Sequence, residues 1–200
     1  MALLPTHHRL WRIGITQMNL PFHRNKAQLK HWNRYFIIGK LSSVGFGYLY
    51  VINFGAMQIR LIQTGTKDYD EMVDLRMKVL LDPIGIPRSY INSDKEKEDI
   101  LIGAFEQDKL VGCCILTHID NLTLQLRQMA VDHSLQTKGV GRSIISFAEQ
   151  IAKEKGYQFL MMHARDTVME FYKKCGYAIA GEQFFEVGIG HHRMEKRLAD

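Results

Sequence analysis

The residues with the clearest chemical potential form a short glycine-rich turn, Gln136–Ser143, with the sequence QTKGVGRS. Its glycines, Gly139 and Gly141, let the backbone approach a ligand closely, because glycine has no Cβ atom. A helix that begins here would present its unpaired first N–H groups and its dipole to an anion. Lys138 and Arg142 add positive charge. The turn therefore predicts a phosphate-binding site, although a tight strand-to-helix turn would by itself explain the glycines.

Two common nucleotide-binding patterns do not fit this turn. A Walker loop requires the string G-x-x-x-x-G-K-[ST], which the sequence does not contain. A Rossmann fingerprint requires G-x-G-x-x-G, but the third glycine position counted from Gly139 is Ile144. We therefore expect neither of these two modes of nucleotide binding.

Several titratable side chains could transfer protons, but none suggests a metal site. His118, His163 and Asp132 lie near the ends of expected strands and are candidates for a general base. Each is equally well explained as a hydrogen-bonded scaffold residue. His191 and His192 are adjacent, and adjacent strand residues point to opposite faces of a sheet, so we reject a metal pair there.

The cysteines also argue against a metal. Cys113 and Cys114 are adjacent, a spacing that rarely forms a structural disulfide. No C-x-x-C pair or His/Cys cluster predicts zinc. Cys175 is expected to be a small buried thiol rather than a reactive group. This cysteine usage favours a reducing, cytoplasmic compartment.

Strands and helices that could position these residues are legible from Met57 onward. Apolar runs that alternate or are bounded by turn residues predict strands at 58–63, 101–105, 110–119, 122–132, 157–164, 177–185 and 190–198. Period-3.6 patterns predict helices at 68–80 and 139–155, the second ending at Gly156. A third, short helix is expected to begin with the capping box Thr167–Glu170 and to end at Gly176. The stretch 82–99 reads as a loop, with a short helical piece as an alternative. This order predicts an α/β protein with a mixed sheet.

Composition divides the chain near Met57. Residues 1–56 hold seven Lys/Arg and no acidic residue, so the remainder holds 19 basic and 21 acidic residues. The net charge of +5 therefore belongs to the N-terminal segment, and the main body gives no argument for nucleic-acid binding. We interpret 57–200 as one domain and 1–56 as a basic extension that does not belong to the fold.

A membrane-associating role for residues 1–56 is the alternative. Residues 41–56 carry no charge, but they are rich in glycine and serine. They also fall short of the roughly 20 apolar residues of a spanning helix. The absence of acidic residues would also fit a transit peptide, but no cleavage signature stands out. We therefore do not expect a membrane partner.

The string Gln136–Gly141 matches the Q/R-x-x-G-x-G/A signature of the GCN5-related N-acetyltransferase (GNAT) family. It follows a strand that ends in Met129-Ala130-Val131, and the later segment ARDTVMEFYKKCGY resembles the family's A…FY-x-K-x-GF/Y element. The resemblance covers residues 57–200. The tail FFEVGIGHHRMEK and the earlier RMKVLLDPIGIP resemble a bacterial branch of uncharacterised members.

This resemblance implies a mainly antiparallel sheet with a splayed central strand and flanking helices. It also implies transfer of an acetyl group from acetyl-CoA to a primary amine by direct attack in a ternary complex. The residues that match the family's coenzyme site, along one strand and the turn after it, are Met129, Ala130, Val131, Gln136, Thr137, Lys138, Gly139, Val140, Gly141 and Arg142. Tyr172 matches a tyrosine that protonates the departing thiolate, although it could instead only pack.

The expected partners follow from the same resemblance. Acetyl-CoA would be a cosubstrate, and the acceptor would be a small-molecule or peptidyl amine, with no metal and no nucleic acid involved. The oligomeric state stays open, a homodimer included. The alternative function is a non-catalytic acyl-CoA-binding or sensing module with the same fold.

Overall fold

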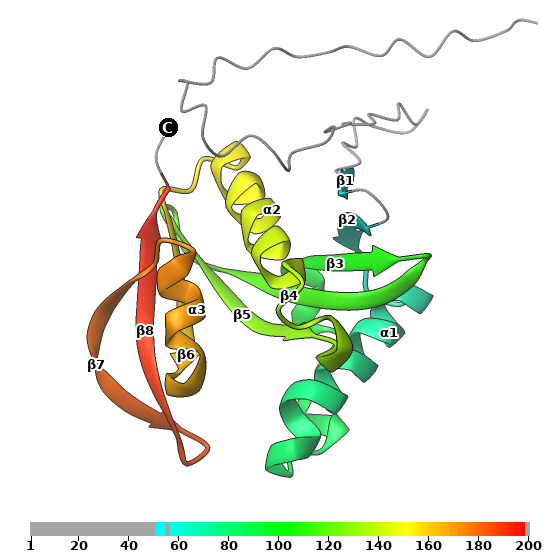
Figure 1. The fold of residues 1–200 in the computed structure, drawn as a ribbon, viewed down its shortest axis with the longest axis horizontal. Coiled ribbons are helices and arrows are strands. Elements are labelled where there is room, and N and C mark those ends of the chain that lie inside the picture. The colour runs from blue at the N-terminus through cyan, green and yellow to red at the C-terminus, as the bar shows by residue number, and fades with distance from the viewer. Residues whose placement is uncertain (1–50, 55–56, 199–200) are drawn as a thin grey trace, which may run out of the picture. The chain divides into compact units, whose positions relative to one another are not determined.

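The structure is a computed structural model that describes residues 51–54 and 57–198. Its strands form a single sheet in the order β1-β2-β3-β4-β5-β6-β8-β7 (Figure 1). Neighbouring strands are antiparallel except for β5 and β6, which are parallel. The strands are β1 (Val51–Phe54), β2 (Met57–Ile62), β3 (Ile100–Glu106), β4 (Lys109–Asp120), β5 (Thr123–Val131), β6 (Phe159–Arg165), β7 (Ala178–Glu186) and β8 (Ile189–Arg197). The predicted mixed, mainly antiparallel sheet is confirmed.

Three α-helices and several short helical turns accompany the sheet in the described part of the chain. The α-helices are α1 (Lys67–Arg76), α2 (Val140–Glu154) and α3 (Met169–Lys174). A π-helical turn, η2 (Met77–Leu81), extends α1. The stretch predicted as a loop contains the 3-10 turns η3 (Asp82–Ile84), η4 (Arg88–Tyr90) and η5 (Lys95–Glu98), and two more, η6 (His133–Leu135) and η7 (Asp166–Val168), precede α2 and α3. No helix within these residues is long and apolar enough to cross a bilayer.

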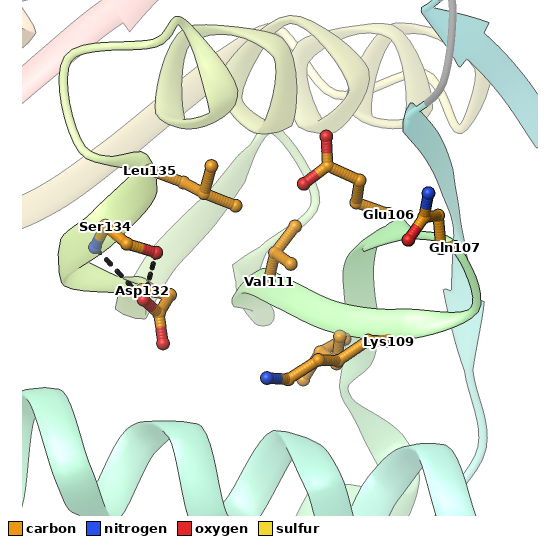
Figure 2. A pocket seen from close by; sticks show the side chains of 8 residues that line it. Glu106, Gln107, Lys109, Val111, Asp132, Ser134 and Leu135 are labelled. Carbon is orange, nitrogen blue, oxygen red and sulfur yellow. Dashed lines mark hydrogen bonds between the residues drawn. The ribbon is translucent and has the colours of Figure 1, made fainter.

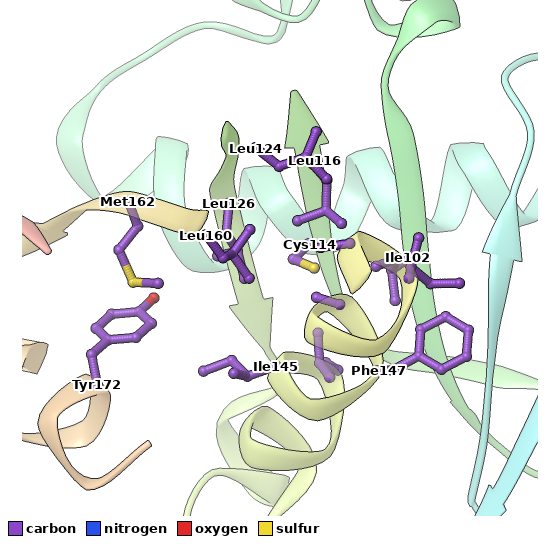
Figure 3. Close-up of a cluster of buried hydrophobic side chains, with 14 of the residues drawn as sticks. Ile102, Cys114, Leu116, Leu124, Leu126, Ile145, Phe147, Leu160, Met162 and Tyr172 are labelled. Atoms are coloured by element: carbon purple, nitrogen blue, oxygen red, sulfur yellow. The ribbon is translucent and has the colours of Figure 1, made fainter. Parts of the chain in front are cut away.

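The helices cover the two faces of the sheet with two separate hydrophobic cores. Phe147 of α2 and Tyr172 of α3 belong to a core on one face, together with Leu126 and Leu160 of the strands (Figure 3). Buried residues of α1, such as Met72, belong to a second core. The sheet therefore separates α2 and α3, which pack on one face, from α1, which packs on the other.

Strand β5 contains one extra residue relative to β4, which interrupts the regular pairing of the two strands. The partners Ile115↔Arg127 and Cys113↔Ala130 show three steps along β5 against two along β4. Gln128 takes a left-handed backbone conformation at this point, with φ +48°. An extra residue of this kind is a β-bulge, which bends a strand and increases its twist.

The bend separates β5 from its other neighbour. Strand β6 pairs with β5 only through Thr123↔Phe159, Leu124↔Leu160 and Gln125↔Met161. Beyond these pairs the two strands diverge (Figure 1). The second half of β5 therefore has no strand partner on its β6 side, and the expected splayed strand is confirmed.

Two local expectations differ from the structure. Strand β1 pairs with β2, so the sheet includes four residues upstream of Met57, where VINF has the β-branched and aromatic residues typical of strands. The other residues of the proposed extension, 1–50 and 55–56, lie outside the described residues, so the boundary at Met57 stays a prediction. The prediction of a capping box at Thr167–Glu170 is wrong. The turn η7 leads directly into α3, whose cap residue Val168 makes no side-chain hydrogen bond.

The predicted helix ends are confirmed. Gly156 follows α2 with φ +84°, and Gly176 follows α3 with φ +90°. Both values lie in the left-handed region that ends helices.

Candidate active site

The loop between β5 and α2 is tied down by its own side chains. The carboxylate of Asp132 accepts hydrogen bonds from the backbone N–H of Ser134 at 3.0 Å and from its hydroxyl at 2.8 Å. Gln136 donates its side-chain amide to the Val131 carbonyl at 3.2 Å. Gln136, the first residue of the glycine signature, therefore fixes the loop to the end of β5.

The turn itself leaves the start of α2 open. Thr137 and Gly139 both have left-handed backbones, with φ +70° and +87°. The first backbone hydrogen bond after Gly139 runs from the Ser143 N–H to the Gly139 carbonyl at 3.0 Å. The N–H groups of Val140, Gly141 and Arg142 precede it and have no carbonyl within the helix to reach. Free N–H groups at a helix start can bind an anion, and the anion site at this turn stays a prediction.

The two cations of the turn differ in their surroundings. Lys138 is exposed. The guanidinium of Arg142 donates to the carbonyl of Lys174 at the end of α3, at 3.1 Å. That carbonyl belongs to the negative end of the α3 dipole, which favours a cation. Arg142 therefore links α2 to α3, and its other N–H groups remain available to a ligand.

Gly141 is closely packed, and its backbone conformation does not call for glycine. A Cβ atom at this position would lie 3.0 Å from Met129 Cε and 3.1 Å from Phe171 Cζ. The start of α2 therefore sits directly against β5 and α3, and the turn, the splayed strand and α3 meet at one place.

Tyr172 reaches the splayed strand from α3. Its hydroxyl lies 3.7 Å from the thioether sulfur of Met129, on the unpaired half of β5. Its side chain is only 8% exposed. Burial raises the pKa of the Tyr172 hydroxyl above its ordinary value, and the nearby thiols of Cys114 and Cys175 act in the same direction. The hydroxyl is therefore protonated at neutral pH.

A buried polar network holds the bulge from the other face of the sheet. Arg76 of α1 is 0% exposed and forms a bidentate pair with Glu96, at 2.9 and 2.7 Å. Its Nε–H also donates to the side-chain oxygen of Gln128, the bulge residue, at 2.6 Å. Tyr69 donates its hydroxyl to Glu96 at 2.8 Å. The members of this network lie on three separate elements, α1, η5 and β5, so no local sequence pattern predicts it.

The three candidate bases do not lie together. Asp132 accepts from Lys78 at 3.0 Å. That hydrogen bond and those from Ser134 hold the pKa of Asp132 well below its usual range, which makes it a poor base. His118 contacts the Tyr157 hydroxyl at 3.0 Å and is paired with Leu124, at the opposite end of β5 from Met129. Asp132 therefore lacks the basicity that the role requires, and His118 lies too far along the strand.

His163 is placed differently from those two. Its Nδ1 lies 2.7 Å from Glu186 Oε1, so this nitrogen carries the proton and Nε2 is left as an acceptor. It lies on β6, one of the two diverging strands. His163 therefore stays the candidate base.

The histidine pair near the C-terminus has structural partners. His191 Nδ1 lies 2.8 Å from the carbonyl of Ile189, and His192 Nδ1 lies 2.8 Å from Asp166 Oδ1. Among the described residues no group of three or more His, Cys, Asp or Glu side chains could hold a metal ion. Cys175 is half-buried, and burial raises the pKa of its thiol.

Two shallow hollows flank the turn on the side away from β6. A cavity of about 360 Å³ lies between the β3–β4 turn and η6, with Glu106, Lys109 and Asp132 in its lining (Figure 2). A second, of about 230 Å³, adjoins the start of α2 and is lined by Lys138 and Ser143 among others. Neither is lined by residues of β6 or α3, so neither lies where β5 and β6 diverge.

Comparison with known proteins identifies the fold. The family model described as the acetyltransferase (GNAT) domain matches residues 86–198. The chain belongs to the GNAT acetyltransferase family. The matched range of this GNAT chain includes the splayed strand, the glycine turn and Tyr172.

Individual relatives of this GNAT chain are distant. A Bacillus subtilis (strain 168) protein named as an acetyltransferase is 28% identical over 140 residues, which cover 67% of this chain and 92% of the relative. A Lactobacillus plantarum protein named as an N-acetyltransferase has a crystal structure with TM-score 0.66 and 20% identity, covering 72% of this chain and 100% of that one. A GNAT acetyltransferase from Elizabethkingia anophelis, solved with acetyl-CoA bound, has TM-score 0.57 and 22% identity, covering 72% and 99%. At these sequence identities, the structural similarity shows a shared fold and nothing more.

Proposed function

We propose that this protein transfers an acetyl group from acetyl-CoA to a primary amine by direct attack in a ternary complex. One observation carries the proposal: the buried Tyr172 hydroxyl meets a sulfur atom, that of Met129, beside the unpaired half of β5. A thioether is a weak hydrogen-bond acceptor. The hydroxyl can therefore exchange it at little cost for a stronger acceptor such as a thiolate.

Two elements of the chain would hold the coenzyme. The turn from Gln136 to Arg142 would hold the pyrophosphate through backbone N–H groups, with Lys138 adding charge. The edge formed by Met129, Ala130 and Val131 would pair with the pantetheine arm as an added strand does. A backbone N–H of this edge would also polarise the thioester carbonyl, an effect of roughly 3–4 kcal/mol in comparable sites.

The protons balance with the residues available. Acetyl-CoA supplies the acyl carbon, whose bond to sulfur breaks as its bond to the amine nitrogen forms. The amine loses a proton, and we assign its removal to His163 Nε2 or to water bound there. The departing thiolate gains one from the Tyr172 hydroxyl. Tyr172 is regenerated from solvent, and its raised pKa keeps it in the acid form that the step requires.

Two measurements test this function. Isothermal titration with acetyl-CoA tests binding, and release of free thiol in the presence of polyamines, amino acids, aminoglycosides or peptides tests catalysis. We expect micromolar binding and thiol release above hydrolysis with at least one amine class. Binding without turnover on any amine would favour the acyl-CoA-binding module instead, and absence of binding would contradict both functions.

A further inference from the structure

Arg165, the last residue of β6, differs from every other shielded cation in the described residues. Five Lys and Arg side chains there are buried or half-buried. Four have a carboxylate at ion-pair distance: Arg60 with Asp68, Arg76 with Glu96, Arg127 with Asp99 and Lys196 with Glu149. Arg165 has none. Its only hydrogen bond within these residues goes to the carbonyl of Leu80, at 3.2 Å.

Asp166, which follows Arg165 in the sequence, and Glu186, on β7, both bind other side chains. Asp166 accepts from His192 at 2.8 Å and from Gln183 at 2.5 Å. Glu186 is bonded to His163. A half-buried positive charge without a counter-charge is costly, because shielded charges are normally paired. The arginine fork still has several N–H donors suited to bidentate binding of a planar carboxylate.

Arg165 projects from the face of the sheet opposite the glycine turn and Tyr172. The anion-binding turn and Tyr172 lie with α2 and α3, so the coenzyme approaches from that face of the sheet. Leu160, Met162 and Ala164 of β6 point to the same face, whereas Arg165 alternates with them and reaches η2, the extension of α1. An amine attacking from the opposite face would pass this guanidinium.

His191, beside Arg165, could accept a hydrogen bond from the amine of a molecule whose carboxylate binds Arg165. His191 of β8 is its register partner, so the two Cβ atoms lie roughly 5 Å apart. The ring of His191 donates through Nδ1 to Ile189, which leaves Nε2 as an acceptor. His163, the candidate base, projects from the same face of β6, two residues before Arg165.

We propose that the acceptor amine also carries a carboxylate, which Arg165 binds. The acceptors would be amino acids or peptides with a free carboxylate near the reacting amine. This inference rests on the proposed N-acetyltransferase function and adds the class of its acceptor. The hydrogen bond to Leu80 by itself would give Arg165 only a structural role, linking β6 to η2. The experiment separates this structural role from carboxylate binding.

Matched acceptors provide the test. Alanine and lysine are compared with alaninamide and lysinamide, which keep the amine but lose the negative charge. Glycine, β-alanine, 4-aminobutyrate and 6-aminohexanoate vary the distance between the two groups. In wild type we expect kcat/KM for a carboxylate to exceed that for its amide by about tenfold or more. In Arg165→Gln the KM for the carboxylate should rise by about 10- to 100-fold, as for lost charge-assisted hydrogen bonds.

Controls assign the effect. The KM values for the amides and for acetyl-CoA should be unchanged in Arg165→Gln, and Arg165→Lys should be intermediate. Arg197→Gln removes the same charge from an exposed site at the other end of β8 and should leave the preference intact. An equal loss of kcat/KM with carboxylates and amides would show that Arg165 has only a structural role and would overturn the proposal.

A binding measurement keeps this inference separate from the question of turnover. Titration of the same acids and amides into protein saturated with coenzyme A should show tighter binding of an acid, and only when Arg165 is present. Acetylation of amines without any preference for the acid would refute the carboxylate site and leave the proposed function standing. Binding of acids that depends on Arg165 but is not followed by thiol release would support the carboxylate site and contradict the proposed acetyl transfer.

Discussion

The Tyr172 hydroxyl lies 3.7 Å from the sulfur of Met129, so a helix on one face of the sheet contacts the strand that its neighbour has left unpaired. If Tyr172 donates the proton to the thiolate, Tyr172→Phe should lower kcat by about 100-fold or more. The KM for acetyl-CoA should change less than about threefold, because the ring remains. Steady-state thiol release measures both.

Tyr177→Phe is the control for this substitution. Tyr177 is also buried, but it donates its hydroxyl to Glu149 at 3.0 Å, away from β5. Its loss should cost about 1 kcal/mol of stability and leave kcat unchanged. Because the pKa of Tyr172 is raised, kcat should not fall through its ionisation as the pH rises to 10. Equal activity of Tyr172→Phe and wild type would remove the proton-donor role.

The glycines at the two ends of α2 separate ligand binding from backbone strain. Gly139 and Gly156 have φ +87° and +84°, and a Cβ atom at either would meet nothing within 4 Å. Alanine at each should therefore cost roughly 1–2 kcal/mol of unfolding free energy. Only Gly139→Ala should also weaken acetyl-CoA binding, by about tenfold. Urea unfolding and isothermal titration test this pair, and equal affinities would place the pyrophosphate elsewhere.

The buried pair between Arg76 and Glu96 should be expensive to break. Arg76→Met leaves the Glu96 carboxylate without its partner, which should destabilise the protein by about 3–5 kcal/mol. Restoring neutrality with Arg76→Met/Glu96→Met should recover part of this loss. The urea midpoints of the two variants give the comparison, and a double variant less stable than the single one would contradict it.

Tyr69 should make stability depend on alkaline pH. Burial and the hydrogen bond to Glu96 raise the pKa of Tyr69 to about 12, above the value near 10 of an unfolded tyrosine. The folded state therefore favours the neutral phenol. The resulting stabilisation is fully present below pH 10 and is lost as the pH rises from about 10 to 12. Urea unfolding of wild type and Tyr69→Phe across this range should show a shallower pH slope for the variant.

The three thiols should differ in reactivity. Cys113 and Cys114 are fully buried, and burial raises the pKa of Cys113 to about 12. Cys175 is only half-buried. Because the thiolate is the reactive form, a disulfide reagent should modify Cys175 first and the adjacent pair only upon unfolding. Mass spectrometry of partly labelled protein identifies the site, and Cys175→Ser should abolish the early phase.

Much of the fold was predictable because its patterns are local. The apolar periodicity of α2 and the turn residues between β3 and β4 need only neighbouring sequence. The bulge also left a trace in the sequence: Leu124 and Leu126 alternate, and the phase then shifts to Met129 and Val131. The strand predicted at 122–132 runs through this shift without a bulge.

The rest of the site depends on contacts between distant residues. Arg76 and Glu96 are 20 residues apart, and the segment between them folds into short 3-10 turns without a periodic signal. Nothing in the sequence indicates that Arg165 lacks a counter-charge, because this follows only from where Asp166 and Glu186 point. The coenzyme residues, from Met129 to Arg142, and Tyr172 stay predictions, although the structure brings the two groups together.

The close packing at Gly141 has a consequence for how this sequence can evolve. The family signature admits alanine there, but in this protein the extra methyl group would meet Met129 and Phe171. Met129 in turn contacts the Tyr172 hydroxyl. Alanine at position 141 would therefore require Met129 or Phe171 to shift by a few tenths of an ångström. Relatives that carry alanine should show compensating, smaller side chains at the positions of Met129 or Phe171, as a covarying triplet.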